Sequence, residues 1–575
     1  MSLSSILTTT AAGLANTDYQ IALANANVAN ASDTSYSRKT ADFGAITSTV
    51  SLSTAATTRV ADDYLTLATA TAASSAGRDA AISSALQSYD AQLGTVATGD
   101  DVSSLLTAFQ TAVTGLASTG ATSAAQAGVV SAAGQLATAI RGLSGTIQTL
   151  RGQASTDIAS TVATVNTAAD TIASLNDQIV STGASGGDVT NLEDQRDAAL
   201  QTLSGALGIS YYTTPDNRVQ VYTAGGAALV GDQANHLSYT ASSTLSAGVT
   251  YPGQISGIML GGQDITSSIT TGTIGGLITL RDTTLVGEQA KLDQLATTLI
   301  ATTNAVSNAG SAYPAPATLT GSVTVTAADS LGASGTLRVA VTTASGTVAA
   351  TQDFNRAAYP TVGSLVTALN GLGGVSASIS PSGKLVLAAT DPTQGVALAD
   401  IGASVGPAGV GVSAYFGLND VFSGQNATDI AVSAGLQANP ASLPTAALPS
   451  TATLSVGAVA LTSGDSAVAD RLNAAISAAT TFPTAGGFPA QSTSLQSYAS
   501  SFVSSAAGLV SGASAAADQS QATFTAAQSR LDNLTNVNTD EELALLTTYE
   551  QQYQANAQMV SMVRTMFTAL MTMMA

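Results

Sequence analysis

Few residues in this sequence of 575 have the types and spacing that catalysis or ligand binding requires. Imidazole can ligate a metal, paired carboxylates can act as acid and base, and a glycine-rich loop can cradle a phosphate. The candidates are one histidine, two aspartate pairs, a charged trio and a glycine run: His236, Asp62-Asp63, Asp100-Asp101, Asp194-Arg196-Asp197 and 371–374.

Most of these candidates lack the companions that such chemistry needs. His236 has no further ligand at metal-binding spacing and lies in a Ser- and Asn-rich loop, so we expect a surface residue. Capping or turn roles suit the aspartate pairs better than catalysis. The glycine run lacks the Lys and Ser/Thr of a phosphate loop and predicts a turn. The chain has no cysteine, which excludes thiol chemistry and disulfides.

The charged trio at 194–197 has two interpretations. The simpler one is a solvated helix face with local ion pairs, each worth about 0.2–1 kcal/mol. The alternative is a bridge that joins two domains. Since no constellation of nucleophile, base and carboxylates is visible, we predict that the protein is not an enzyme and has no catalytic residues, no cofactor and no metal site.

The strongest patterns lie at the two chain ends, where apolar residues recur every seven positions. The stretch 536–575 carries one such repeat, and the first thirty residues carry another. We predict an assembly interface from these rows: Leu7, Leu14, Ile21 and Val28 at one end, and Leu546, Tyr553, Val560, Phe567 and Met574 at the other.

The apolar face of the C-terminal helix is wider than a two-helix seam requires. Further rows accompany the repeats: Leu3, Thr10, Thr17 and Ala24; Tyr549, Val563 and Leu570 with Asn556 between them; and Met559, Met566 and Met573. One partner helix cannot cover all of them, so we expect packing between subunits. Burial within one copy is too small to offset the ordering of both ends, so we expect frayed or disordered termini in the monomer.

Composition restricts the partners and the location. The net charge is −20, and the 16 basic residues are scattered singly, which argues against binding to nucleic acid or an anionic membrane. The first basic residue is Arg38, so an ordinary cleavable signal peptide is not expected. The uncharged stretch 102–140 is interrupted by Ser, Thr, Gln and Gly, and therefore does not predict a membrane span.

Proline placement divides the chain into helical and β tracts. The first proline is Pro215, none lies between Pro252 and Pro314, and none follows Pro489. Long helices can persist in these three proline-free tracts. Apolar stripes at three places need burial, and the simplest solution packs them as one antiparallel bundle: 158–179, 278–306 and 495–534.

The fold class predicted is α+β and multidomain: an elongated helical rod built from N- and C-terminal segments, with β-rich insertion domains projecting outward and both termini at one end. The expected domains are a terminal helical core (1–37 and 536–575), a helical rod (38–207, 275–312 and 490–535), a β-rich insertion (208–274) and an outer β-rich insertion (313–489). Within them we predict a hairpin of 209–213 with 219–223, strands at 322–326, 336–342 and 384–388, a helix at 364–370, and a helix that Asp188 caps.

Several stretches resemble flagellar axial proteins. The C-terminal run 538–557 is similar to their terminal signature, and Tyr36-Ser37-Arg38 resembles their Gly-Tyr-x-Arg motif, with Ser35 in place of the glycine. The runs 192–197 and 275–282 resemble inner motifs of the flagellar hook-associated protein 1 family (FlgK), whereas 314–489 is poorly matched apart from the run 415–420. These internal matches separate that family from the hook proteins.

The resemblance implies a structural subunit of the bacterial flagellum at the junction between hook and filament. Its implied partners are further copies of itself in a homo-oligomeric ring or helical layer, the hook protein, the second hook-filament junction protein, and an export chaperone on the C-terminal helix. It also implies type III export, without a cleavable signal peptide, to an extracellular position. Alternatives are another axial protein of hook or filament type, or a surface-layer protein or adhesin that uses the Thr- and Gly-rich β region.

Overall fold

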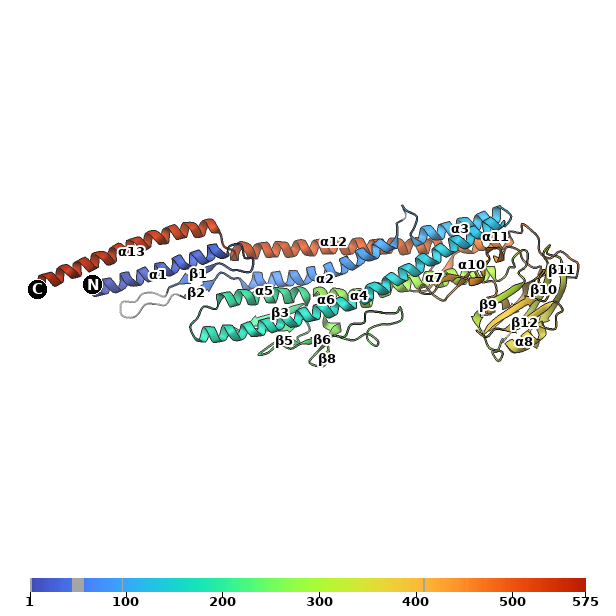
Figure 1. Cartoon of the computed structure of the whole chain (residues 1–575), viewed down its shortest axis with the longest axis horizontal. Helices are drawn as coiled ribbons and strands as arrows, with labels where there is room; N and C mark the ends of the chain where they lie inside the picture. The colour runs from blue at the N-terminus through green and yellow to red at the C-terminus, as the bar shows by residue number, and fades with distance from the viewer. Residues whose placement is uncertain are drawn as a thin grey trace.

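The computed structural model describes residues 3–43, 56–95, 97–332, 334–406, 409–451 and 453–574. The chain forms an elongated rod with the N- and C-termini at one end and a β domain at the other (Figure 1). Long helices alternate with small antiparallel sheets, which confirms the predicted α+β fold class. None of the helices described combines the length and apolar character that a membrane span needs.

Two helices from opposite ends of the sequence form the narrow end of the molecule. Helix α1 (Leu3–Asn30) packs antiparallel against α13 (Thr539–Met574), and we call them the terminal pair (Figure 1). The side chain of Asn538 accepts hydrogen bonds from the first amides of α13, and Asp540, Glu541 and Glu542 occupy its first turn. Both ends are continuous helices in the single chain; fraying in a dilute monomer stays a prediction.

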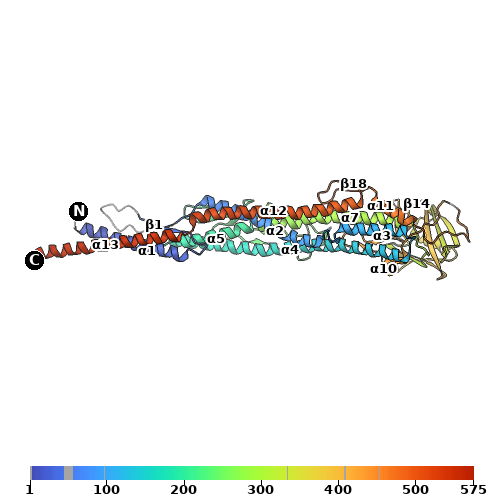
Figure 2. The same ribbon diagram turned by 90° about the horizontal axis from the view of Figure 1, so that it is seen from above.

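The rod consists of long helices with a shared apolar core. Its members are α2 (Asp63–Leu93), α3 (Val102–Ser118), α4 (Ser123–Ala184), α5 (Thr190–Ala206), α6 (Gly272–Thr279), α7 (Leu285–Ser307), α11 (Ala467–Ser477) and α12 (Leu495–Thr535). A π-helical turn, Leu280–Thr284, joins α6 to α7. Seen from above, these helices run along one narrow axis (Figure 2).

The predicted bundle needs one correction. Helix α7 contacts both α4 and α12, but its hydrogen bonds to α4 are at Ser144 and Gln148, outside the stripe 158–179, and α12 packs chiefly against α2. The physical reason is the small-residue surface of both helices: Ala72 and Ser75 of α2 line one groove with Ala516 and Ser520 of α12, and small side chains let the helices approach closely. The stripe 495–534 therefore finds its main partner outside the three stripes that the periodicity singled out.

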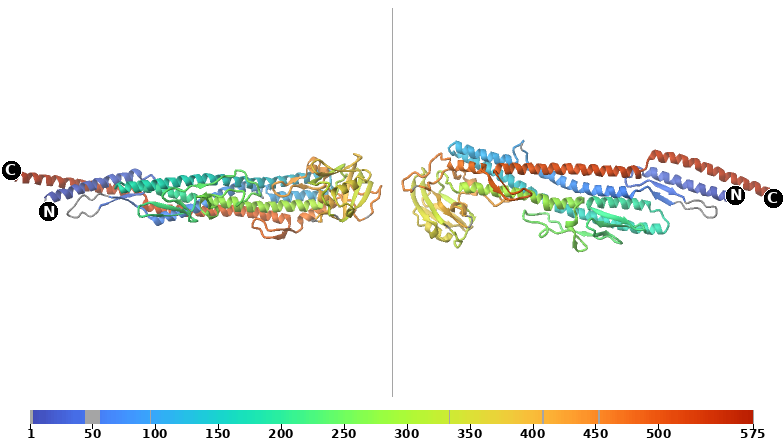
Figure 3. Two further views of the ribbon diagram at one scale, coloured as in Figure 1. Left: turned by 90° about the horizontal axis from the view of Figure 1, so that it is seen from below. Right: turned by 180° about the vertical axis from the view of Figure 1, so that it is seen from behind.

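A first β insertion lies along one side of the rod (Figure 3). The strands are β3 (Ile209–Thr213), β4 (Val219–Thr223) and β5 (Ala228–Val230) in one sheet, and β6 (Leu237–Ser238), β7 (Met259–Leu260) and β8 (Gln263–Asp264) in another. The predicted hairpin is confirmed, since Ile209 pairs with Thr223 and Thr213 with Val219. Its apolar residues join the rod core, so the insertion is attached rather than free-standing.

The outer domain has a core of its own at the far end of the rod (Figure 1). One sheet holds β11 (Val348–Asn355), β10 (Ser334–Thr343) and β14 (Gln394–Ser404); the other holds β12 (Val375–Ile379), β13 (Lys384–Ala389) and β9 (Thr318–Thr324). Helices α8 (Val362–Leu369) and α9 (Val412–Phe416) pack into the core of this domain. The remaining short elements contribute to the rod core instead: α10 (Ala434–Ala438), and the two-stranded sheets β15 (Phe422–Ser423) with β16 (Ala431–Val432) and β17 (Thr480–Phe482) with β18 (Gln491–Thr493). The predicted strands and the helix near 364–370 are confirmed.

Part of the 313–489 range belongs with the rod in space. Helix α11 packs on α3 and α7, and Phe422 lies edge-to-face on Phe109 with ring centroids 5.8 Å apart. The domain limits given above remain a proposal.

Two local expectations turn out differently. Helix α5 has Val189 at its N-cap position, and Asp188 instead accepts from the amide and hydroxyl of Thr190 (2.9 and 2.8 Å). The turn at Ser35 forms without glycine because the Asp33 carboxylate accepts from both the amide and the hydroxyl of Ser35.

Candidate functional site

The seam of the terminal pair is built from small and polar side chains. On α1 the buried residues are Thr10, Thr17, Ala24 and Asn27. On α13 the side chain of Asn556 faces Gly13 and lies 3.4 Å from the Thr17 hydroxyl. A Cβ at Gly13 would lie 3.3 Å from the Asn556 amide. Because the two helices approach closely there, large apolar side chains are displaced to the flanks.

The predicted interface residues lie on those flanks. On α1, Leu7, Leu14, Ile21 and Val28 are half-buried. On α13, Leu546 and Val560 are half-buried, while Tyr553 and Phe567 are 38% and 37% exposed. The side chain of Met574 lies outside the described residues. The single chain therefore leaves this row partly open to solvent, and its burial by another copy stays a prediction.

A methionine flank lies on the other side of the α13 seam. Val563 is buried at the centre, whereas Met559, Met566 and Met573 are 46%, 53% and 86% exposed. Methionine is flexible and polarisable, which suits it to packing against varied partners. Helix α13 thus presents two apolar flanks that α1 does not cover.

A polar junction joins the terminal pair to the rod. Its upper layer consists of Asn27, Arg38 and Glu542. The Asn27 amide donates to Glu542 (3.1 Å) and to the Lys39 carbonyl (2.9 Å), and Arg38 Nε donates to Glu542 (2.7 Å). Glu542 is only 2% exposed, so its charge is balanced inside the protein by Arg38.

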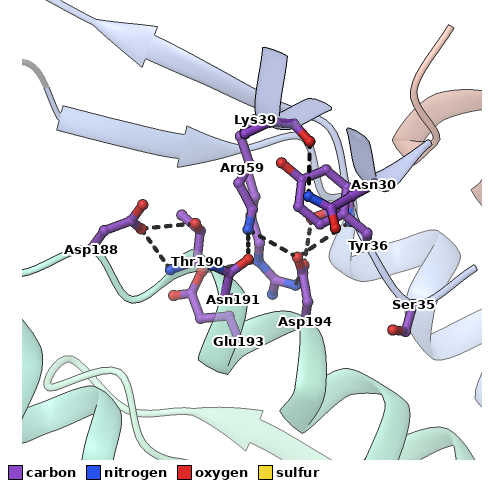
Figure 4. Close-up of polar contacts among 12 residues, drawn as sticks. Asn30, Ser35, Tyr36, Lys39, Arg59, Asp188, Thr190, Asn191, Glu193 and Asp194 are labelled. Atoms are coloured by element: carbon purple, nitrogen blue, oxygen red, sulfur yellow. Dashed lines mark hydrogen bonds and ion pairs between the residues drawn. The ribbon is translucent and has the colours of Figure 1, made fainter. Parts of the chain in front are cut away.

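The lower layer of the polar junction binds the β1–β2 hairpin to α5 (Figure 4). Strand β1 (Lys39–Asp42) pairs with β2 (Ala56–Arg59). Asp194 on α5 accepts from the Ser37 hydroxyl (2.5 Å) and lies 3.6 Å from Lys39 Nζ. Arg59 spans three carboxylates of α5, Glu193, Asp194 and Asp197, at 3.0, 3.3 and 2.5 Å.

This arrangement corrects the simpler interpretation of the charged trio. Asp194 is 6% exposed and Arg196 only 2%, so neither lies on a solvated face. Arg196 donates to the Asn217 carbonyl at 2.6 Å and thereby holds the β3–β4 turn. Asp194 and Asp197 join separate segments, which is the alternative interpretation.

The electrostatics of the polar junction follow from burial among carboxylates. Burial, reinforced by Asp194 and Glu542, raises the pKa of Tyr36 to about 12, and its hydroxyl donates to Asn27 at 2.9 Å. Burial alone would lower the pKa of Arg59, but the carboxylates around it outweigh burial and raise it. Both groups therefore keep one protonation state at neutral pH.

The remaining candidates have structural positions. His236 is exposed and bonds to Asp170 at 2.8 Å. Asp62 and Asp101 cap α2 and α3, Asp100 accepts from the turn before α3, and 371–374 forms a turn. Among the described residues, no three His, Asp or Glu side chains gather as metal ligands.

Two segments of the chain match known protein families. Residues 86–317 match the flagellar hook-associated protein FlgK helical domain. The chain carries a FlgK helical domain. Residues 528–573, which include most of α13, match the C-terminal domain of the flagellar basal body rod proteins FlgEFG. The resemblance to the FlgK family is confirmed, because the motifs 192–197 and 275–282 both lie in the matched range. Residues 86–317 of this chain are therefore similar to a domain of the flagellar hook-associated proteins.

One similar solved structure is that of the flagellar hook junction protein FlgK from Burkholderia pseudomallei. It shares 17% identity over 81% of this chain and 98% of that chain, with a TM-score of 0.46. No curated protein matches the chain at a significant level.

Several residues of the polar junction escaped the sequence analysis: Asn27, Lys39, Arg59, Glu542, and Arg38 as an ion-pair partner. One signal was present for Glu542, which precedes Tyr549 by seven positions and so continues the row of Asn556 and Val563. A carboxylate in a helix-packing row indicates a buried pair.

Proposed function

We propose that the protein is a structural subunit of the layer that joins the flagellar hook to the filament. Copies would associate through the exposed flanks of α13 and the half-buried row of α1. One observation carries the proposal: α1 covers only the centre of the apolar face of α13 and leaves large side chains exposed on both sides. The family match to the hook-associated proteins supports the location.

The partners that follow are other copies in a homo-oligomeric ring or helical layer, the hook protein on one side, and the second hook-filament junction protein on the other. Before export, a chaperone would bind the C-terminal helix and shield its methionines. The protein would leave the cell through the flagellar type III route and function in the extracellular part of the flagellum.

The test of this role is a cell that lacks the protein. We expect hooks to form but filaments to detach, with loss of motility, and a plasmid copy to restore both. Retained filaments and normal motility in the deletion strain would contradict the proposal. A chain without 536–575 should fail to complement, although its β domains fold.

The same truncation separates the alternatives. A surface-layer protein or adhesin built on the outer β domain should keep its binding after removal of 536–575. A hook- or filament-type axial protein would instead give long polymers of the full chain, visible by electron microscopy, whereas a junction subunit is expected to add a limited layer to purified hooks.

A further inference from the structure

Two short segments connect the terminal pair to the rest of the molecule. Residues 31–38 follow α1, and 536–538 separate α12 from α13. At Asn536 the backbone is extended, with φ −73° and ψ 156°. Because no helix runs through either connection, helical continuity does not set the direction in which the terminal pair leaves the rod.

One carboxylate contacts the segments whose relative positions define that direction. Glu542 belongs to α13, accepts from Asn27 of α1 at 3.1 Å, and accepts from Arg38 at 2.7 Å. The backbone amide of Arg38 in turn donates to the carbonyl of Thr535, the last residue of α12, at 2.7 Å. Glu542 is thus linked to α1 directly and to the end of α12 through Arg38.

The segment 37–39, which we call the strip, carries Arg38 and is itself fixed to the rod. On one side of Arg38, Ser37 donates to Asp194 of α5 through its amide and hydroxyl (3.3 and 2.5 Å). On the other side, Lys39 Nζ bonds to Asn191 and forms an ion pair with Asp194. Charge-assisted contacts among nearly buried groups have defined geometry, so the strip is a rigid reference for Glu542.

We propose that Glu542 is a positioning residue that fixes the angle between the terminal pair and the rod, and thereby aims the exposed flanks of α13 at a neighbouring copy. This inference rests on the proposed function. A simple helix-dipole role does not explain the burial of Glu542, because Asp540 lies in the same first turn and is exposed. Asp540 therefore serves as the matched control.

The absence of cysteine from the sequence allows clean labelling. Spin labels at Thr547→Cys on α13 and Thr171→Cys on α4, both exposed positions, report the angle through their distance distribution by double electron–electron resonance. We expect one narrow distribution for the labelled parent and for Asp540→Ala, and a broadened or shifted one for Glu542→Ala at unchanged helix content. Arg38→Gln is the second variant, in case Glu542→Ala unfolds the terminal pair. It leaves the Asn27–Glu542 bond in place and should also broaden or shift the distance distribution.

Self-assembly of the unlabelled chains completes the test. The critical concentration should rise about tenfold or more for Glu542→Ala and stay unchanged for Asp540→Ala. A parental distance distribution in Glu542→Ala and Arg38→Gln, or a broadened one with unchanged assembly, would overturn the positioning role and leave the proposed function intact. The proposed function is tested by a different experiment: it would be contradicted if the deletion strain retained its filaments.

Discussion

Replacement of Phe567 by aspartate tests the flank of α13 most sharply. Phe567 is 37% exposed in the single chain. A phenylalanine buries roughly 150–250 Å² in total, so about 55–90 Å² remains for a neighbouring copy to cover. At ~25 cal/mol per Å² this area contributes about 1.4–2.3 kcal/mol to each contact between copies.

The substitution loses that contribution and places a carboxylate in the contact. The area term alone lowers the association constant of one contact by about 10- to 50-fold. An unpaired buried carboxylate costs several kcal/mol more, so assembly should be abolished at working concentrations. Within the isolated chain the effect is confined to the terminal pair, and the rod and the β domains should melt as in the parent.

The assay is sedimentation of purified chain, together with complementation of motility in the deletion strain. Thr565→Asp is the matched control, because Thr565 is exposed and lies near the opposite side of α13. We expect the control to assemble and Phe567→Asp to remain monomeric with an intact circular dichroism spectrum. Normal assembly of Phe567→Asp would refute the assignment of this flank to contacts between copies.

Three further predictions concern stability. Gly152→Ala on α4 should destabilise the protein by about 1–3 kcal/mol in thermal melts, since its Cβ would lie 2.3 Å from a backbone carbonyl, whereas Gly145→Ala, with open space around it, should be neutral or stabilising. Arg356→Met should raise the melting temperature, because the three guanidinium nitrogens of Arg356 are buried without a hydrogen-bond partner. Arg338→Met should lower the melting temperature, because Arg338 pairs with a carboxylate at 2.7 Å. A lower melting temperature for Arg356→Met than for Arg338→Met would contradict the reasoning. Burial raises the pKa of Asp420 above 3.8, so the contribution of Asp420 to stability is greatest below that pH and falls as pH rises through the raised pKa. Asp420→Asn should therefore flatten the dependence of melting temperature on pH between pH 4 and 7, and an unchanged dependence would contradict the reasoning.

The order of helical and β tracts could be predicted because local signals agree there. Apolar periodicity marks the faces of α4 and α7, and the absence of proline lets these helices run on. The hairpin of β3 and β4 has its turn at Asn217, whose φ is 64°. The helix that packs against α12 was harder to predict, because a long face of Ala, Ser and Gly is compatible with several neighbouring helices.

The terminal pair shows where periodicity alone is insufficient. Heptad reasoning gives most weight to large apolar residues and therefore placed Leu14 and Val560 at the interface. In the single chain the centre of the seam belongs to Gly13, Thr17 and Asn556, because small side chains allow close approach. The large residues then lie on the flanks, where only another chain can cover them completely.

The polar junction could not be predicted, because its partners are distant in sequence. Asn27 and Glu542 are separated by 515 positions, and Ser37 and Asp194 by 157. Local charge patterning suggested ion pairs within α5, whereas Arg59 reaches α5 from the β1–β2 hairpin. Pairing of this kind is set by topology, which a single sequence does not reveal.

Solvent access at position 567 tests most directly whether copies of the chain complete one another. A single cysteine at this position, in a chain that otherwise has none, can be labelled with a maleimide in the dilute monomer and after assembly on purified hooks. The account predicts that assembly slows labelling of Phe567→Cys at least tenfold while Thr565→Cys continues to react. Equal labelling of Phe567→Cys in monomer and assembly would contradict it.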